Sequence, residues 1–122
     1  MAQIPRDEQI RLLLQGKAYG TVRALFPGKQ LTGGEYKEVF TVKRNDVIEY
    51  VKREGFPSGS YGHRPGGGDG PYMIEEAGEF IVYYQERGLR FDEVRRARRE
   101  EANEVLIDLL LGLSGTGLYG AA

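Results

Sequence analysis

Hydrophobic positions follow helical spacing near the C-terminus of the chain. Over residues 99–112 the apolar side chains recur at i, i+3, i+4 and i+7, which predicts an amphipathic helix. The apolar positions are Ala102, Val105, Leu106, Leu109, Leu110 and Leu113. Acidic residues suit the first turn of a helix and basic residues do not. We therefore expect the helix to begin after the arginines at 95, 96, 98 and 99.

Residues 71–96 alternate as a β-meander. Strands are predicted at 72–75, 79–85 and 89–94, with turns at 76–78 and 86–88. Both faces of the second strand carry large apolar groups, which predicts that it is central. In the third strand Leu89, Phe91 and Glu93 are expected on one face.

The first half of the chain has shorter helical patterns. Helices are predicted at 7–15, 18–26 and 46–54. Asp7 is the expected N-cap of the first, Asn45 is the expected N-cap of the third, and Gly55 is expected to end the third. Residues 31–43 fit either a short helix, with Thr32 and Glu35 at capping-box spacing, or an extended end at 40–43. We favour the helix.

Glycine is abundant, with 18 residues in the chain, and seven of them lie at 55–70. The run at 66–70 leads into Pro71 and a strand rather than a helix, and no lysine follows, so a phosphate-binding loop is disfavoured. The sequence predicts one α+β domain over residues 1–122. It comprises a mainly helical part at 1–54, a flexible glycine-rich connector at 55–70, a meander plus helix at 71–112, and a flexible tail at 113–122. The N-terminal helices and the C-terminal helix should pack on one face of the small antiparallel sheet.

Composition excludes several chemistries. The 122 residues contain no cysteine and one histidine, His63, so thiolate catalysis, zinc–thiolate sites and multi-histidine metal centres are excluded. We predict no cofactor and no metal. The N-terminus lacks the pattern of a secretory signal, and no apolar run approaches the roughly 18 residues of a membrane helix. A cytoplasmic protein that does not enter a membrane is expected.

Charge patterns give two further hypotheses. Lys plus Arg is 17 and Asp plus Glu is 18, without the basic excess typical of nucleic-acid binders. Arg95–Arg99 could contact phosphates, but residues 86–101 hold six basic and five acidic side chains, which favours a mixed ion-pair surface. His63 could act as a general base, yet no catalytic set accompanies it in the sequence. We therefore predict that the chain is not an enzyme.

Acidic and tyrosine side chains concentrate in the middle of the chain, and tyrosine is common at protein interfaces. An acidic hairpin would suit a basic partner. The candidate partner-binding residues are Tyr61, Asp69, Tyr72, Glu75, Glu76, Glu79, Tyr83 and Arg87.

A family resemblance covers about residues 72–111. Val82, Tyr83 and Tyr84, then Glu86, Arg87 and Gly88, form a VYY-x-ERG pattern before an EEA…LL helix containing Glu100, Glu101, Ala102, Leu106, Leu109 and Leu110. This resembles small bacterial immunity proteins of polymorphic toxin systems. The resemblance implies a cytoplasmic protein that binds a cognate toxin enzyme and occludes its active site. The alternatives are a regulatory or scaffold domain unrelated to toxins, and a weak nucleic-acid binder acting through Arg95–Arg99.

Overall fold

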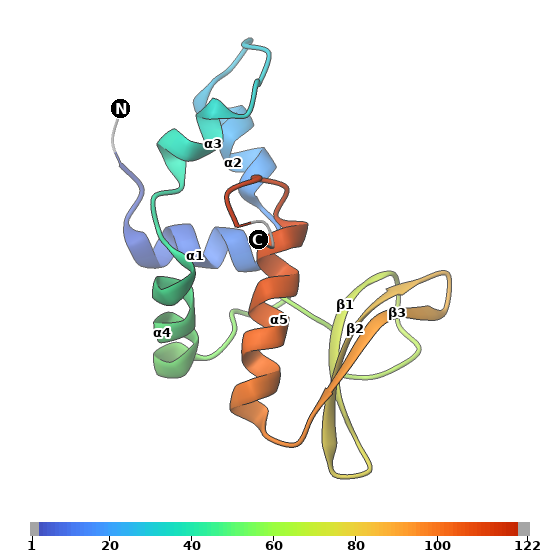
Figure 1. The fold of residues 1–122 in the computed structure, drawn as a ribbon. Helices are drawn as coiled ribbons and strands as arrows, with labels where there is room; N and C mark the ends of the chain where they lie inside the picture. Colours follow the sequence, from blue (N-terminus) through green and yellow to red (C-terminus); the bar gives the residue numbers. More distant parts are fainter. Residues whose placement is uncertain (1–2, 120–122) are drawn as a thin grey trace.

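Five helices and a three-stranded antiparallel sheet make up the computed structural model, which describes residues 3–119 (Figure 1). The predicted α+β class is confirmed. In chain order the elements are α1 (Arg6–Leu14), α2 (Ala18–Leu25), α3 (Gly34–Val39), α4 (Arg44–Glu54), β1 (Gly70–Glu76), β2 (Glu79–Glu86), β3 (Leu89–Arg96) and α5 (Arg99–Leu113).

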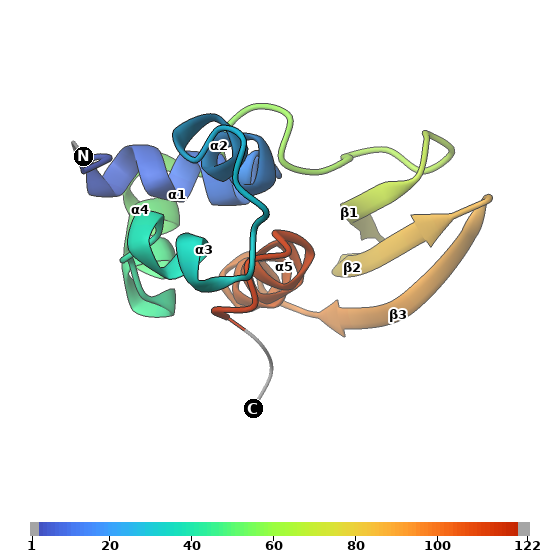
Figure 2. The ribbon, with the colours of Figure 1, turned by 90° about the horizontal axis from the view of Figure 1, so that it is seen from above.

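Helix α5 lies between the other helices and the sheet (Figures 1 and 2). It contacts α1 and α4 on one side and all three strands on the other. The predicted stripe is buried at Ala102, Leu106 and Leu110, and Ile107 and Leu111, outside that stripe, are buried as well. A helix covered on two sides needs apolar residues around most of its circumference.

Two helix starts differ from the prediction. Helix α1 begins at Arg6 after Pro5, so Asp7 lies in the first turn instead of capping it. Helix α4 begins at Arg44, so Asn45 is not the N-cap either. The reason at α4 is Asp46, whose carboxylate accepts the backbone N–H of Lys43 at 2.8 Å and so replaces the expected cap.

The arginine-rich junction is close to the prediction. Arg95 and Arg96 belong to β3, and Arg98 is the N-cap of α5. Arg99 is nevertheless the first residue of the helix. Its guanidinium lies over the Phe80 ring, 4.7 Å from the centroid, and this contact with β2 holds it there.

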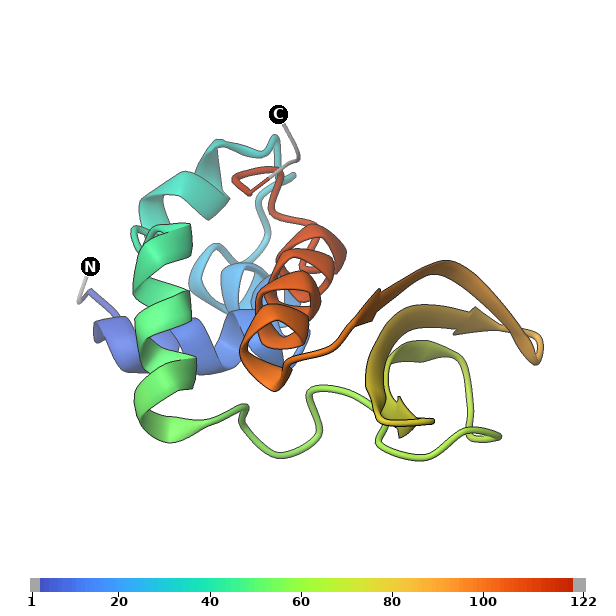
Figure 3. The ribbon, with the colours of Figure 1, turned by 60° about the horizontal axis from the view of Figure 1, so that its bottom comes forward.

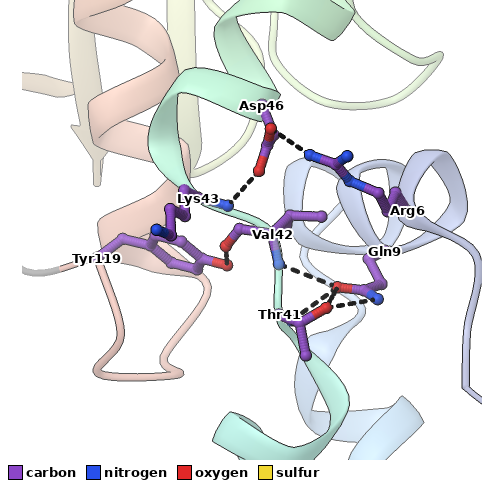
Figure 4. Close-up of polar contacts among 7 residues, drawn as sticks. All are labelled: Arg6, Gln9, Thr41, Val42, Lys43, Asp46 and Tyr119. Carbon is purple, nitrogen blue, oxygen red and sulfur yellow. Dashed lines mark hydrogen bonds and ion pairs between the residues drawn. The ribbon is translucent and has the colours of Figure 1, made fainter.

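Residues 40–43 are extended after the short helix α3, and the side chain of Gln9 binds their backbone (Figure 4). The Gln9 carbonyl oxygen accepts the N–H groups of Thr41 at 2.8 Å and Val42 at 3.3 Å, and its amide donates to the Ile4 carbonyl at 2.8 Å. Gln9 is fully buried. It therefore satisfies amides that would otherwise need a neighbouring strand.

Residues near the C-terminus pack against the other side of the extended segment 40–43. The Tyr119 hydroxyl donates to the Val42 carbonyl at 2.7 Å, and burial raises the pKa of Tyr119 to about 12 (Figure 4). Ser114 and Thr116 are buried. Residues 114–119, expected in a flexible tail, thus pack on the helical part because Tyr119 finds a hydrogen-bond acceptor there. The rest of that predicted tail, 120–122, lies outside the described residues.

The sheet has the order β1-β2-β3, which confirms β2 as the central strand. Both hairpins have two-residue loops in which both residues have positive φ: 53° and 80° at Ala77–Gly78, and 51° and 80° at Arg87–Gly88. This is the type I′ geometry that matches the twist of the strands.

A β-bulge interrupts the β2–β3 pairing and overturns one prediction. Val82 pairs with Val94 and Tyr84 with Phe91, so two residues of β3, Asp92 and Glu93, oppose a single residue of β2. The extra residue moves Glu93 to the face opposite Phe91. Leu89 and Phe91 therefore share one face as expected, but the prediction is wrong for Glu93, which lies on the other face.

A buried carboxylate anchors the loop before α3. Glu35 is 2% exposed, and its carboxylate accepts the backbone N–H groups of Thr32 at 2.9 Å and Gly33 at 3.2 Å. Lys29 lies 2.7 Å away. Thr32 and Glu35 thus make one half of the predicted capping box. The Lys29 hydrogen bond, followed by those from the backbone, lowers the pKa of Glu35 to about 2.

Ala77 is the residue of the first hairpin whose replacement should stabilise the protein. A side chain at φ 53° costs about 1–2 kcal/mol, and glycine avoids that cost. We expect Ala77→Gly to raise the free energy of unfolding by about 0.5–1 kcal/mol in urea denaturation. Ala97→Gly, at an exposed alanine without positive φ, is the control and should stabilise nothing; an equal gain in both variants would contradict the explanation.

Glu35 should make the stability of the protein fall at acidic pH. Its pKa is lower in the folded protein than in the unfolded chain, so its contribution is present above about pH 4.5 and is lost as the pH falls toward 2. We expect Glu35→Gln to have a lower melting temperature at pH 7 and a smaller further loss down to pH 2.5. Glu38→Gln, at an exposed residue of the same helix, is the matched control. Parallel melting curves for Glu35→Gln and the wild type across this range would contradict the assignment.

Candidate binding surface on the hairpins

Tyr72 and Tyr83 form the centre of the sheet face that points away from α5. They pair across β1 and β2, and their rings stack with centroids 5.2 Å apart and planes 4° from parallel. The Arg90 guanidinium lies over the Tyr83 ring at 4.7 Å. Tyr72 is 5% exposed and Tyr83 is 0% exposed, so both rings belong to the interior of the protein. Their selection as binding residues is corrected: with Ile74 and Ile81 they form a second small core.

The glycine-rich connector runs beside the sheet (Figure 3), and its backbone lies against Tyr72 of this second core. The Gly62 N–H donates to the Pro71 carbonyl at 2.9 Å, and the Met73 N–H donates to the Gly62 carbonyl at 3.0 Å. The Tyr72 hydroxyl donates to the Gly68 carbonyl at 2.7 Å, and the Gln85 side chain binds the same carbonyl. The connector is therefore packed on the sheet, contrary to the expected flexible joint.

Only glycine fits at position 62, because the Tyr72 ring lies close to the backbone there. A Cβ atom there would lie 2.3 Å from the Tyr72 ring, and one at Gly67 would lie 2.4 Å from the Tyr72 hydroxyl oxygen. Gly68 has open space around it. Part of the glycine excess thus lets the chain lie flat against a tyrosine.

The acidic residues selected from the sequence lie at the β1–β2 turn, where β3 arginines neutralise two of them. Glu76 lies 3.3 Å from Arg90, and Glu79 lies 3.8 Å from Arg95. Glu75 is exposed. The Arg90 guanidinium donates a hydrogen bond to Glu93, and this bond is the largest cause that raises the pKa of Arg90. This end of the sheet is an ion-pair surface and not the free acidic patch that was expected.

Asp69 and Arg87 meet at the other end of the sheet. The Asp69 carboxylate accepts the backbone N–H of Arg87 at 2.9 Å, which fixes the connector to the β2–β3 turn. Tyr61 is half-buried between Phe56 and His63, with ring centroids 5.3 and 4.5 Å away. His63 itself is exposed. Of the predicted residues, Asp69 and Arg87 are joined by this hydrogen bond, and Tyr61, Asp69 and Tyr72 line one hollow of about 200 Å³ between the connector and β1.

An exposed apolar surface beside that turn was missed. Leu89 is 63% exposed and Phe91 is 45% exposed, and Phe91 continues the cross-strand row Pro71–Tyr84. We call Pro71, Tyr84, Leu89 and Phe91 the hairpin surface. It shares the sheet face of α5 but lies beyond the buried pair Met73 and Val82. Charged residues at five of the eight β3 positions were the available signal that this strand is an exposed edge.

The described residues show neither a metal site nor a membrane-spanning helix. Within residues 3–119, no group of three or more acidic or histidine side chains could hold a metal ion. None of the helices in this range has the length and apolar character needed to cross a membrane.

Gly62 gives a direct test of the covered tyrosine face. We expect Gly62→Ala to lower the free energy of unfolding by about 2 kcal/mol, because the added methyl group displaces the stacked Tyr72 ring. Gly68→Ala, six residues away in open space, should be neutral or slightly stabilising. Urea denaturation of both variants measures the difference, and equal stabilities would show that the connector does not pack on Tyr72.

Comparison with known proteins leaves the site to be judged on its own geometry. The chain matches no protein-family description, no curated protein sequence and no solved structure.

Proposed function

We propose that this chain is a non-catalytic binding protein of the immunity type, which uses the hairpin surface to bind and block a basic toxin enzyme. The observation that carries the proposal is the exposure of Leu89 and Phe91 on a projecting hairpin. Exposed large apolar side chains grouped on one face are typical of protein interaction sites. Aromatic side chains are also frequent among the residues that dominate binding energy.

The rigidity of the hairpin supports the same function. Its type I′ turn, the bulge at Asp92 and the hydrogen bond from Arg87 to Asp69 fix the backbone on both sides of Phe91. A surface held in one conformation before binding loses little entropy when the partner arrives. A projecting rigid hairpin can also enter a cleft, which is the geometry needed to occlude an active site.

Local charge favours a basic partner. Asp69, Glu86 and Asp92 lie near the β2–β3 turn with Arg87, while the guanidinium of nearby Arg90 is paired with Glu76 and Glu93. Asp69, Glu86 and Asp92 make no ion pair within residues 3–119, whereas Glu76 and Glu79 at the opposite end are neutralised. The surplus negative charge would steer and orient a positively charged surface. The acidic contribution expected from the sequence thus moves from the β1–β2 turn to the β2–β3 turn.

The VYY-x-ERG pattern that carries the resemblance occupies β2 and this turn. Val82 and Tyr83 are buried, and Gly88 has φ 80°, so these positions serve folding. Tyr84 is half-buried and belongs to the hairpin surface. The pattern therefore supports the proposal by building the hairpin, and half-buried Tyr84 contributes to the hairpin surface.

Binding can be tested with the protein encoded by the adjacent upstream gene. We expect the two proteins to co-purify after coexpression and the chain to restore growth of cells that produce the partner. Leu89→Ser combined with Phe91→Ser should weaken binding by at least about tenfold in calorimetry while leaving the melting temperature nearly unchanged.

Tyr19→Ser is the matched control, since Tyr19 is 60% exposed on α2, and α2 lies away from the sheet (Figure 2). It should bind as the wild type does. Co-purification without growth rescue would favour a regulatory or scaffold domain over an immunity protein. Full affinity in the double variant would exclude the hairpin surface, and failure to co-purify would reject the toxin partner.

A further inference from the structure

A hollow of about 190 Å³ adjoins the hairpin surface at Pro71. Leu13 and Leu14 of α1 and Leu110 of α5 line it and are at most 5% exposed, so they form its floor. Leu113, the last residue of α5, lines the hollow as well and is 48% exposed. The hollow is therefore an apolar recess with an exposed leucine at its mouth.

The lining of the hollow suits an uncharged, apolar occupant. Among the described residues, none that lines it carries a charged side chain. Its two polar side chains already donate within the chain: the Gln15 amide to the Ser58 carbonyl at 3.0 Å, and the Ser60 hydroxyl to the Pro57 carbonyl at 2.6 Å. A charged group would lose its water here without meeting an opposite charge, whereas an apolar group gains by leaving water.

The apolar surface is continuous from this hollow to the edge of the sheet. Pro71 pairs with Tyr84, and Tyr84 pairs with Phe91, so the three form one row across β1, β2 and β3. Neighbouring strands lie about 4.8 Å apart, which puts the backbone of Phe91 about 10 Å from that of Pro71. A standard interface covers roughly 800 Å² of each partner. A partner that contacts Phe91 and Leu89 therefore extends over the hollow as well.

We propose that the hollow receives one large apolar side chain of the partner that binds the hairpin surface, an inference that rests on the proposed function. This side chain, a leucine, methionine or phenylalanine, packs on Leu13, Leu14 and Leu110 and is flanked by Leu113. Side chains that dominate the binding energy of an interface are typically seated in pockets of this kind. The partner thus carries a protruding apolar side chain about 10 Å from its contact with Phe91, beside the positive charge that the β2–β3 turn attracts.

Methyl resonances at the floor of the hollow report on its occupant. The protein encoded by the adjacent upstream gene is added to the methyl-labelled chain, and ¹³C–¹H correlation spectra are recorded. The Leu13 and Leu14 methyl resonances should shift, because the inserted side chain packs directly on them. The methyl resonances of Val47, which is buried in the same core but outside the hollow, are the control and should not shift.

Variants at the mouth of the hollow test its contribution to affinity. Leu113→Ser should weaken binding of the upstream protein about fivefold to tenfold in calorimetry, with little change in melting temperature because Leu113 is half-exposed. Leu113→Met conserves the volume and should retain most of the affinity. Leu118→Ser is the matched control, since Leu118 is 37% exposed and does not line this hollow; it should bind as the wild type does.

The outcomes separate this inference from the proposed function. Unshifted Leu13 and Leu14 resonances in a complex that forms, equal affinity of Leu113→Ser and the wild type, or equal loss in the two serine variants would each overturn the inference and leave the proposed function standing. Shifts of the same resonances on concentrating the chain alone would also overturn it, because they assign the hollow to a second copy. Failure of the wild-type chain to bind the upstream protein would reject both.

Discussion

The burial of α5 on two sides is the constraint on which the rest of the structure depends. The four preceding helices are short, and a small sheet needs an apolar face or a packed helix to be stable in water. Because α5 contacts both groups, the side chains of the helical part and of one sheet face join in a single core that includes Met73 and Val82. The residues that make α5 apolar beyond one stripe, Ile107 and Leu111, are therefore as necessary as the predicted stripe.

The opposite face of the sheet creates a second requirement. Tyr72 and Tyr83 present large apolar rings there, and no helix is left to cover them. The connector covers them with backbone, which is possible only where the chain has no Cβ atom at closest approach. The bridge from Gly62 to Tyr72 also occupies the outer edge of β1. A segment whose composition indicates flexibility is thus fixed by its contacts with the sheet.

Local signals predicted most elements, and contacts between distant residues produced most of the errors. The helix over 99–112 and the three strands of the meander follow from periodicity, and the glycines at 78 and 88 indicate the turns. The extended backbone at 41–42 depends on Gln9, 32 or more residues earlier, and Tyr119 is placed by Val42, 77 residues earlier. For the candidate site, Asp69 and Arg87 could be selected by residue type. The exposure of Leu89 and Phe91 could not, since alternation alone does not tell where α5 ends over the sheet.

The limited reach of α5 over the sheet explains why the hairpin surface exists. Helix α5 covers the row that contains Met73 and Val82, and its Leu110 and Leu113 line a hollow with Pro71 of the next row. Tyr84 and Phe91 of that row extend beyond the helix. An exposed edge strand with apolar residues would ordinarily invite pairing with other chains. In β3 the bulge at Asp92 and the surrounding arginines and acids oppose such pairing, while Phe91 stays on the α5 side of the sheet at a point that α5 does not cover. The strand is thus protected along its edge and open on its face, a combination that suits recognition by side-chain packing rather than by strand addition. This distinction is the physical reason for our proposal that a folded enzyme surface, and not an extended peptide, is the partner.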